Sequence, residues 1–136
     1  MAHEKFRAEV LTPEGEVFND EVEMVSTKTT VGSIGVLAHH EPVLAMLEPT
    51  ELRLYTSESE CIKFAQAEGY MQIAENRALI LVEEAHAPGD LDAASLRDRL
   101  KQAEQELSEA GEDTERRRVA ERDRVRFEEF LRIAEG

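Results

Sequence analysis

Apolar and polar residues alternate with a period of two along the first part of the chain, the spacing that places every second side chain on one face of a β-strand. The alternation occurs in short runs, at Phe6, Ala8 and Val10, at Leu52 and Leu54, at Ile62 and Phe64, at Met71 and Ile73, and at Ala78, Ile80 and Val82. Turn-forming residues separate these runs, at Pro13 to Gly15, Asn19-Asp20, Gly32, Pro49, Ser57 to Ser59, Gly69 and Asn76. Short strands divided in this way predict an antiparallel sandwich or a flattened barrel.

After Pro88-Gly89-Asp90 the apolar residues recur at alternating steps of four and three, which is the period of an α-helix. This stripe consists of Leu96, Leu100, Ala103, Leu107 and Ala110. Asp90 or Asp92 can cap the start of the helix, and Gly111 ends it. A second helical pattern runs from about residue 113 to residue 134.

The two parts together predict a mainly β N-terminal sandwich or flattened barrel at residues 1–87, followed by an antiparallel α-helical hairpin at residues 88–136. Each helix of the hairpin carries one modest apolar stripe, and its remaining residues are densely charged. Two such helices bury little more than each other, so an isolated pair is only marginally stable. We therefore expect a hairpin that can detach or extend.

The composition excludes some classes of function. The chain has 136 residues, with 30 acidic and 16 basic side chains and a net charge of −14. Because nucleic-acid binding relies on cationic contacts, no nucleic-acid partner is expected. The single cysteine, Cys61, cannot form an internal disulfide. No apolar run approaches the roughly 18 residues of a membrane helix, so direct membrane insertion is not expected either.

Basic side chains are concentrated in the second helical segment. They are Arg116, Arg117, Arg118, Arg122, Arg124, Arg126 and Arg132. Two interpretations remain open at this point. The arginines form a solvated face that pairs with carboxylates of the same helix, or they form a face that binds a partner.

The stretch VGSIGVLAHHEPVLAML at residues 31–47 suggests chemistry that its details do not support. Its glycines lack the lysine and the spacing of a phosphate-binding loop, and are typical of a tight turn between strands. His39 and His40 are adjacent, so in an extended chain they point to opposite faces, and no metal site is predicted. The chain also lacks a G-x-S-x-G motif, and Cys61 has no nearby histidine in a recognisable order. No catalytic residue and no cofactor is predicted, which favours a binding or coupling protein.

The whole chain nevertheless resembles a known family, the epsilon subunit of F-type ATP synthase, which is called delta in mitochondria. The most specific part is residues 32–47, GSIGVLAHHEPVLAML, which is similar to the family pattern G-x-x-G-[IV]-[LY]-P-x-H-A-P-[IVL]-[IVL]-x-x-L. The glycines, His40, Pro42 and the apolar residues match. Ala38 replaces the usual proline and Glu41 replaces the usual alanine.

The resemblance implies a non-catalytic subunit of the rotor in the central stalk. In this family the sandwich binds the gamma subunit and sits on the c-ring, so that proton-driven rotation reaches the catalytic head. By this resemblance, residues 1–87 bind gamma and the c-ring, with the ring contact at Gly32, Ser33, Ile34, Gly35 and His40. We expect Ser33 and Ile34 to be exposed on a tip, with His40 close behind it. The resemblance also implies a peripheral location on the cytoplasmic face of the bacterial cell membrane.

For the hairpin, the resemblance implies a regulatory role. In the family it extends along gamma toward the alpha and beta subunits and blocks ATP hydrolysis. The residues expected to contact beta are basic residues of the second helix, Arg116, Arg117, Arg118, Arg122 and Arg126. A marginally stable hairpin suits this role, because a switch needs two states that differ by only a few kcal/mol.

Some family members also bind ATP on the folded hairpin through the motif [IL]-D-x-x-R-A. The corresponding residues here are 91–96, LDAASL, in which Leu91 and Asp92 match but Ser95 replaces the arginine and Leu96 the alanine. Asp92 remains a candidate nucleotide contact, yet loss of the cation predicts weak or absent ATP binding. An ATP-sensing module is therefore the alternative function, and a free-standing enzyme on a β scaffold is a third.

Overall fold

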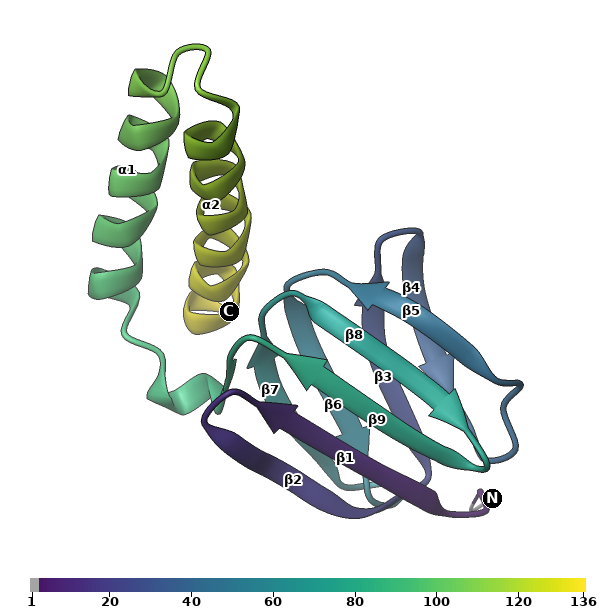
Figure 1. Ribbon diagram of the computed structural model, residues 1–136. Helices are drawn as coiled ribbons and strands as arrows, with labels where there is room; N and C mark the ends of the chain where they lie inside the picture. The colour runs from purple at the N-terminus through teal and green to yellow at the C-terminus, as the bar shows by residue number, and fades with distance from the viewer. Residues whose placement is uncertain (1–2) are drawn as a thin grey trace. The chain divides into compact units, whose positions relative to one another are not determined.

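The computed structural model describes residues 3–136, and the chain divides into two compact units at the bond between Ala87 and Pro88 (Figure 1). The first unit consists of β-strands and the second of helices. This combination confirms the predicted fold class, a β-sandwich or nearly closed barrel followed by a helical hairpin.

Ten strands build the first unit. They are β1 (Phe6–Thr12), β2 (Gly15–Val22), β3 (Met24–Thr29), β4 (Gly32–Val36), β5 (Val43–Leu47), β6 (Thr50–Tyr55), β7 (Cys61–Gln66), β8 (Gly69–Ala74), β9 (Arg77–Val82) and β10 (Ala85–His86). Their hydrogen-bonded order is β10-β7-β6-β3-β5-β8-β9-β1-β2, and β4 pairs with β3. The pairs are antiparallel except β1 with β9, which is parallel.

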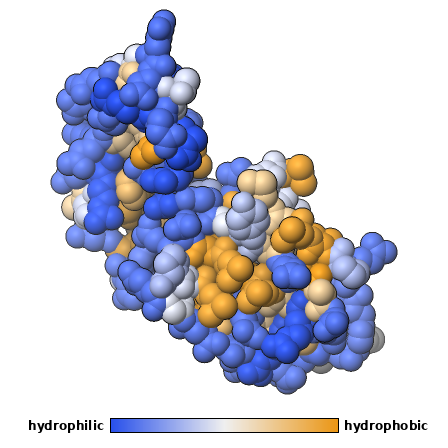
Figure 2. All heavy atoms as spheres, viewed as in Figure 1, coloured by the Kyte–Doolittle hydropathy of each residue, from blue (hydrophilic) through white to orange (hydrophobic). Residues whose placement is uncertain are grey.

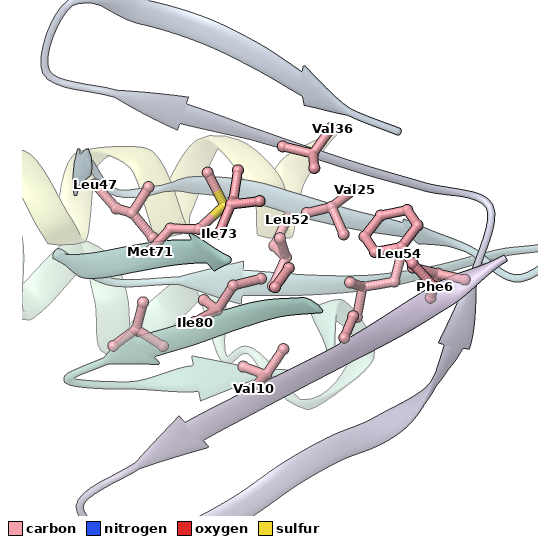
Figure 3. Close-up of a cluster of buried hydrophobic side chains, with 14 residues drawn as sticks. Phe6, Val10, Val25, Val36, Leu47, Leu52, Leu54, Met71, Ile73 and Ile80 are labelled. Atoms are coloured by element: carbon pink, nitrogen blue, oxygen red, sulfur yellow. The ribbon is translucent and has the colours of Figure 1, made fainter. Parts of the chain in front are cut away.

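The alternating apolar residues of the strands meet in one hydrophobic core, shown in Figure 3. Phe6, Val10, Leu52, Leu54 and Ile80 are among its buried members. Because each of these side chains is removed from water, their burial is the main favourable contribution to the stability of this unit. The buried polar pair Thr27 and Gln66 is satisfied, since the Thr27 hydroxyl donates to the Gln66 Oε1 at 2.8 Å.

One expectation from the sequence is wrong in this unit, and one residue of the alternating pattern is more exposed than its neighbour. Ile62 is 41% exposed, although Leu54, with which it is aligned, is buried. The Asn19-Asp20 pair does not form a turn but lies inside β2. Its Asn19 side chain accepts a hydrogen bond from Arg7 Nε at 2.7 Å across the β1–β2 ladder, which gives the amide a partner within the strand.

The second unit contains a short 3₁₀ helix, η1 (Pro88–Asp90), and two α-helices, α1 (Ala93–Glu109) and α2 (Thr114–Glu135). Leu96, Ala103 and Ala110 of the predicted stripe are buried, as expected. Gly111 follows the end of α1 in the left-handed conformation, with φ of 58°, which is typical of glycine after a helix.

Ion pairs at both ends of the hairpin join α1 to α2. Arg116 contacts Glu106 at 2.6 Å near the connecting turn, and Arg97 contacts Glu135 at 3.0 Å at the other end. These contacts pair the end of each helix with the start of the other. The two helices are therefore antiparallel.

Candidate functional site

The β3–β4 connection presents the exposed tip that the sequence suggested, but the turn is formed by Thr30 and Val31. The Thr29 hydroxyl donates to the Gly32 carbonyl at 2.9 Å and accepts from the Val31 amide at 3.2 Å, which closes the turn. Gly32 has φ of 132°, a conformation that residues with a side chain rarely adopt. The Val31 side chain is 95% exposed. Sequence reasoning missed Val31, although an apolar residue beside a turn glycine was a visible signal.

The sequence predicts a tight loop at residues 32–35, but these residues form the first part of strand β4. Ser33 is exposed, as expected. Ile34 is wrongly placed by the sequence analysis, because its side chain packs against the hydrophobic core instead of facing solvent. Gly35 lies in the strand with an ordinary backbone conformation, and a Cβ there would meet only Met24 Sδ, at 3.8 Å.

His40 is not close behind the tip. It follows the opposite end of β4, so the length of the strand, about 13 Å at 3.3 Å per residue, separates it from the turn. Its Nδ1 lies 2.7 Å from the Glu41 carbonyl oxygen. The neighbouring His39 adopts φ of 63° instead of an extended conformation, and its ring Nε2 lies 2.9 Å from a Glu4 oxygen.

Metal binding has no support in this geometry. Within residues 3–136, no three His, Cys, Asp or Glu side chains converge as a metal ion would require. The two adjacent histidines contact different partners instead.

A second exposed feature crosses the outer face of the sheet. Met46 on β5 is aligned with Tyr70 on β8, Tyr70 with Leu81 on β9, and Leu81 with Leu11 on β1. Met46, Tyr70 and Leu81 are exposed, Leu11 is half-buried, and we call these four residues the apolar band. Figure 2 shows hydrophobic residues gathered on the face of the β unit turned toward the viewer.

Sequence reasoning did not identify the apolar band. It concentrated on the buried side of each strand and treated the opposite side as polar. The signal was present in VLAML of β5 and LILV of β9, where consecutive apolar residues supply both faces of a strand.

The candidate inhibitory arginines of α2 already have partners within the hairpin. Arg116 contacts Glu106, Arg118 contacts Glu115 at 2.7 Å, and Arg122 contacts Asp123 at 3.0 Å. Arg117 donates to the Gly111 carbonyl at 3.3 Å, and Arg126 lies half-buried further along the helix.

The paired carboxylates raise the proton affinity of two of these arginines. The hydrogen bond with Glu106 raises the pKa of Arg116, and the hydrogen bond with Glu115 raises the pKa of Arg118. Both arginines are exposed, so water screens the pairs and their contribution to stability is small. A partner of greater negative charge could therefore replace these carboxylates at low energetic cost.

Asp92 has a structural role that explains its position without a nucleotide. It is the N-cap of α1, and its Oδ1 accepts hydrogen bonds from the amides of Ala94 at 3.0 Å and Ser95 at 3.3 Å. These bonds satisfy two of the amides that a helix start leaves without partners. The carboxylate is thereby directed at the backbone of its own helix.

Together these features define an interaction protein, a β-sandwich and a helical hairpin that present an exposed turn and an exposed apolar band. The comparisons with known proteins identify the family. Residues 5–88 match the family described as "ATP synthase, Delta/Epsilon chain, beta-sandwich domain". The chain belongs to this family of ATP synthase subunits.

Relatives align over most of the chain. The ATP synthase epsilon chain of Rubrobacter xylanophilus is 33% identical over 130 residues, which cover 92% of this chain and 88% of that protein. The ATP synthase epsilon chain of Brevibacillus brevis is 32% identical over 105 residues, covering 77% of this chain and 80% of that protein.

Solved structures share the fold at lower identity. A chain from the Euglena gracilis mitochondrial ATP synthase, a structure described as OSCP/F1/c-ring, matches with a TM-score of 0.81 and 20% identity, covering 97% of this chain and 82% of that chain. A chain from the Tetrahymena thermophila mitochondrial ATP synthase, described as central stalk/c-ring, matches with a TM-score of 0.63 and 17% identity, covering 97% and 98%. Among the helices of residues 3–136, none is long and apolar enough to cross a membrane.

Proposed function

We propose that this chain is a non-catalytic rotor subunit of the F-type ATP synthase, in which it couples the c-ring to the gamma subunit. The observation that carries the proposal is the match of residues 5–88 to the delta/epsilon β-sandwich family, in a domain that presents an exposed turn. The c-ring named for both similar structures, and the central stalk named for the Tetrahymena structure, support the same location. As part of that complex, the chain would be peripheral on the cytoplasmic face of the bacterial membrane.

In this proposal, the β3–β4 turn contacts the polar loops of the c-ring. Val31 and Ser33 are exposed there, and Gly32 gives the turn its shape. A projecting turn closed by the Thr29 hydroxyl holds its contact residues in a fixed geometry, as transmission of torque requires. Gly35 lies within β4 and Ile34 anchors this strand to the core, whereas His40 follows the opposite end of the strand.

The hairpin is proposed to restrain ATP hydrolysis by reaching the alpha and beta subunits. Arg116, Arg117, Arg118, Arg122 and Arg126 are the residues proposed to contact beta. The exposed ion pairs at Arg116, Arg118 and Arg122 are weak enough to be exchanged for acidic groups of a partner. Folded and extended hairpins would then differ by a few kcal/mol, which lets assembly or ligands shift the balance.

The test is the ATPase activity of the whole complex assembled with the full chain or with a chain that lacks residues 90–136. Removal of the hairpin should raise hydrolysis while leaving co-purification with gamma and the c-ring intact. Unchanged hydrolysis in an intact complex would remove the inhibitory role. Failure of the full chain to co-purify with gamma and the c-ring would remove the rotor role.

A further inference from the structure

Strand β3, which leads into the exposed turn, changes its neighbour part of the way along its length. On the side away from β4, residues 24–26 pair with β6, whereas Thr29 pairs with Leu47 of β5. Thr27 and Lys28 lie between these two sets of pairs, where β3 passes from one neighbour to the other. Strands bend at such crossings, which form the corners of sandwiches and barrels. The direction in which the turn projects therefore depends on what holds β3 at this crossing.

The side chain of Gln66, on β7, fills the crossing. Gln66 is 0% exposed and Thr27 is 3% exposed. The Thr27 hydroxyl donates to Gln66 Oε1 at 2.8 Å, and Gln66 Nε2 donates to the Glu48 carbonyl oxygen at 2.9 Å, in the connection between β5 and β6. One buried side chain thus joins β7, β3 and the β5–β6 connection. We call Thr27, Gln66 and the Glu48 carbonyl the crossing bracket.

Backbone hydrogen bonds link the crossing bracket to the turn itself. The Glu48 amide donates to the Lys28 carbonyl at 2.9 Å, and the Thr30 amide donates to the Met46 carbonyl at 3.0 Å. On the side away from β4, the last residues of β3 are thus held by the end of β5 and by the β5–β6 connection. Because Gln66 bonds both Thr27 and Glu48, it sets the position of this connection relative to the crossing. A displacement of either group would move the turn.

A buried polar pair gives direction more than it gives stability. Folding exchanges hydrogen bonds with water for those of the bracket, so the net gain in stability is small. A hydrogen bond nevertheless requires one distance and one alignment of donor and acceptor, whereas apolar side chains pack in more than one way. A polar network that is fully satisfied therefore selects a single arrangement of the strands around it.

We propose that Gln66 is a positioning residue for the contact with the c-ring, because it fixes, through Thr27, the direction in which the β3–β4 turn projects. The inference rests on the proposed function, which places Val31 and Ser33 against the ring. Gln66 is buried, so it acts only through the groups that it bonds. Without the bracket, the turn pivots about the crossing and occupies the geometry that fits the ring for a smaller fraction of the time.

The experiment compares the affinity of the full chain for two preparations of ATP synthase that have been depleted of this subunit. One preparation contains the c-ring, and the other consists of the catalytic head and gamma without the ring. Thr27→Val keeps the shape of the side chain but removes its hydroxyl, and we expect it to bind the preparation with the ring about 2- to 10-fold more weakly, the range that one hydrogen bond supplies. Binding to the preparation without the ring should not change, whereas a general loss of folding would weaken both.

Two control variants accompany Thr27→Val. Thr27→Ser keeps a hydroxyl at the crossing and should bind both preparations as the wild type does. Thr12→Val makes the same chemical change elsewhere, because the Thr12 hydroxyl donates to the Gly15 carbonyl at 3.3 Å within the β1–β2 turn. It should also bind both preparations as the wild type does.

The double variant Thr27→Val/Gln66→Leu separates positioning from packing. With both side chains apolar, neither a hydroxyl nor an amide is left buried without a partner, so unfolding should need at least as much urea as for Thr27→Val alone. Binding to the preparation with the ring should nevertheless stay weak, because no directional bond holds the crossing. Recovery of both stability and ring binding would make the pair a packing element and overturn the inference.

The outcomes distinguish this inference from the function on which it rests. A wild-type chain that binds neither preparation would remove the proposed rotor function, and the inference with it. A wild-type chain that binds both equally tightly would remove the proposed ring contact. If the ring tightens binding of the wild type and of Thr27→Val to the same degree, only the positioning role of Gln66 is overturned. Should Thr27→Val unfold before binding can be measured, the double variant carries the same comparison.

Discussion

Gly69 and Leu81 approach so closely that a Cβ on Gly69 would lie 2.0 Å from the Leu81 carbonyl oxygen. A Gly69→Ala substitution must therefore push β8 away from β9, and we expect it to lower the free energy of unfolding by about 2–3 kcal/mol. Thermal or urea unfolding measures the change. Gly89→Ala is the control, because a Cβ there has no neighbour within 4 Å. Equal stability of both variants would show that the strands have room to separate.

Substitutions at neighbouring residues of the β3–β4 connection should have different effects on stability and on proton pumping. Val31→Glu and Ser33→Glu should leave the melting temperature nearly unchanged but reduce ATP-driven proton pumping of the assembled complex, because both side chains are exposed. Ile34→Glu should instead destabilise the isolated chain by about 2–4 kcal/mol, because it puts a charge against the core. Normal proton pumping with both the Val31→Glu and the Ser33→Glu variant would show that the β3–β4 connection is only a turn and not a contact with the c-ring.

Neutralising Arg116, Arg117, Arg118, Arg122 and Arg126 together should raise ATP hydrolysis by the assembled complex. Removing the carboxylates that pair with these arginines within the hairpin should have the opposite effect on ATP hydrolysis. Glu106→Gln and Glu115→Gln remove the carboxylates that Arg116 and Arg118 contact, so these variants should inhibit hydrolysis more strongly than the wild type. Activity that does not change in either experiment, with assembly intact, would assign the arginines to a solvated helix face.

Acid should weaken the second helix. The hydrogen bond from Arg118 lowers the pKa of Glu115, and the hydrogen bond from Arg124 lowers the pKa of Glu121, both from an ordinary value of 4.5. The pKa of each glutamate is lower in the folded chain than in the unfolded chain. Each pair therefore stabilises the helix fully at a pH above the ordinary pKa of 4.5, and this contribution is lost as the pH falls through the lowered pKa. Circular dichroism at 222 nm should show a loss of helix at a pH below 4.5.

The matched control for this titration is the double variant Arg118→Gln/Arg124→Gln. It lacks both pairs at neutral pH, so acid should remove less additional helix from it. An acid transition identical to that of the wild type would mean that other carboxylates control the effect.

Calorimetry with ATP should show no binding in the micromolar range. Ser95 stands where the ATP-binding motif has arginine, and the Asp92 carboxylate already accepts two backbone amides. Ser95→Arg restores a bidentate cation for phosphate and should tighten binding by about 10- to 100-fold. Micromolar affinity of the wild type would contradict this prediction and favour an ATP-sensing module.

The periodicity of the sequence was enough to predict the fold class. A strand with one buried face has an apolar period of two, and a helix with one apolar stripe has a period of three to four. Both periods occur here, the first in short runs before Pro88 and the second after it. Of the two predicted caps, Asp90 and Asp92, the helix begins at Asp92, and the predicted helix stop at Gly111 is confirmed, because caps and stops act on the residues beside them.

The errors arise where contacts between distant residues decide the outcome. Ile34 was expected at a tip because two glycines flank its segment, but pairing with β3 turns its side chain to the core. Ile62 follows the alternating pattern and is aligned with the buried Leu54, yet it is 41% exposed, which the local sequence does not reveal. The apolar band likewise depends on the register of four strands, which periodicity within one strand cannot reveal.

The parallel pairing of β1 with β9 also has a consequence during protein synthesis. Arg7 is aligned with Arg77 and Leu11 with Leu81, so β1 can pair with β2 soon after synthesis but waits for nearly the whole β unit before its other neighbour, β9, has been made. Contacts between residues this far apart in sequence form late, because the intervening chain must be ordered first. The sandwich can therefore close only when β9 has emerged, shortly before the hairpin itself. The order of translation thus completes the strands of the β unit before the helices of the second unit have been made.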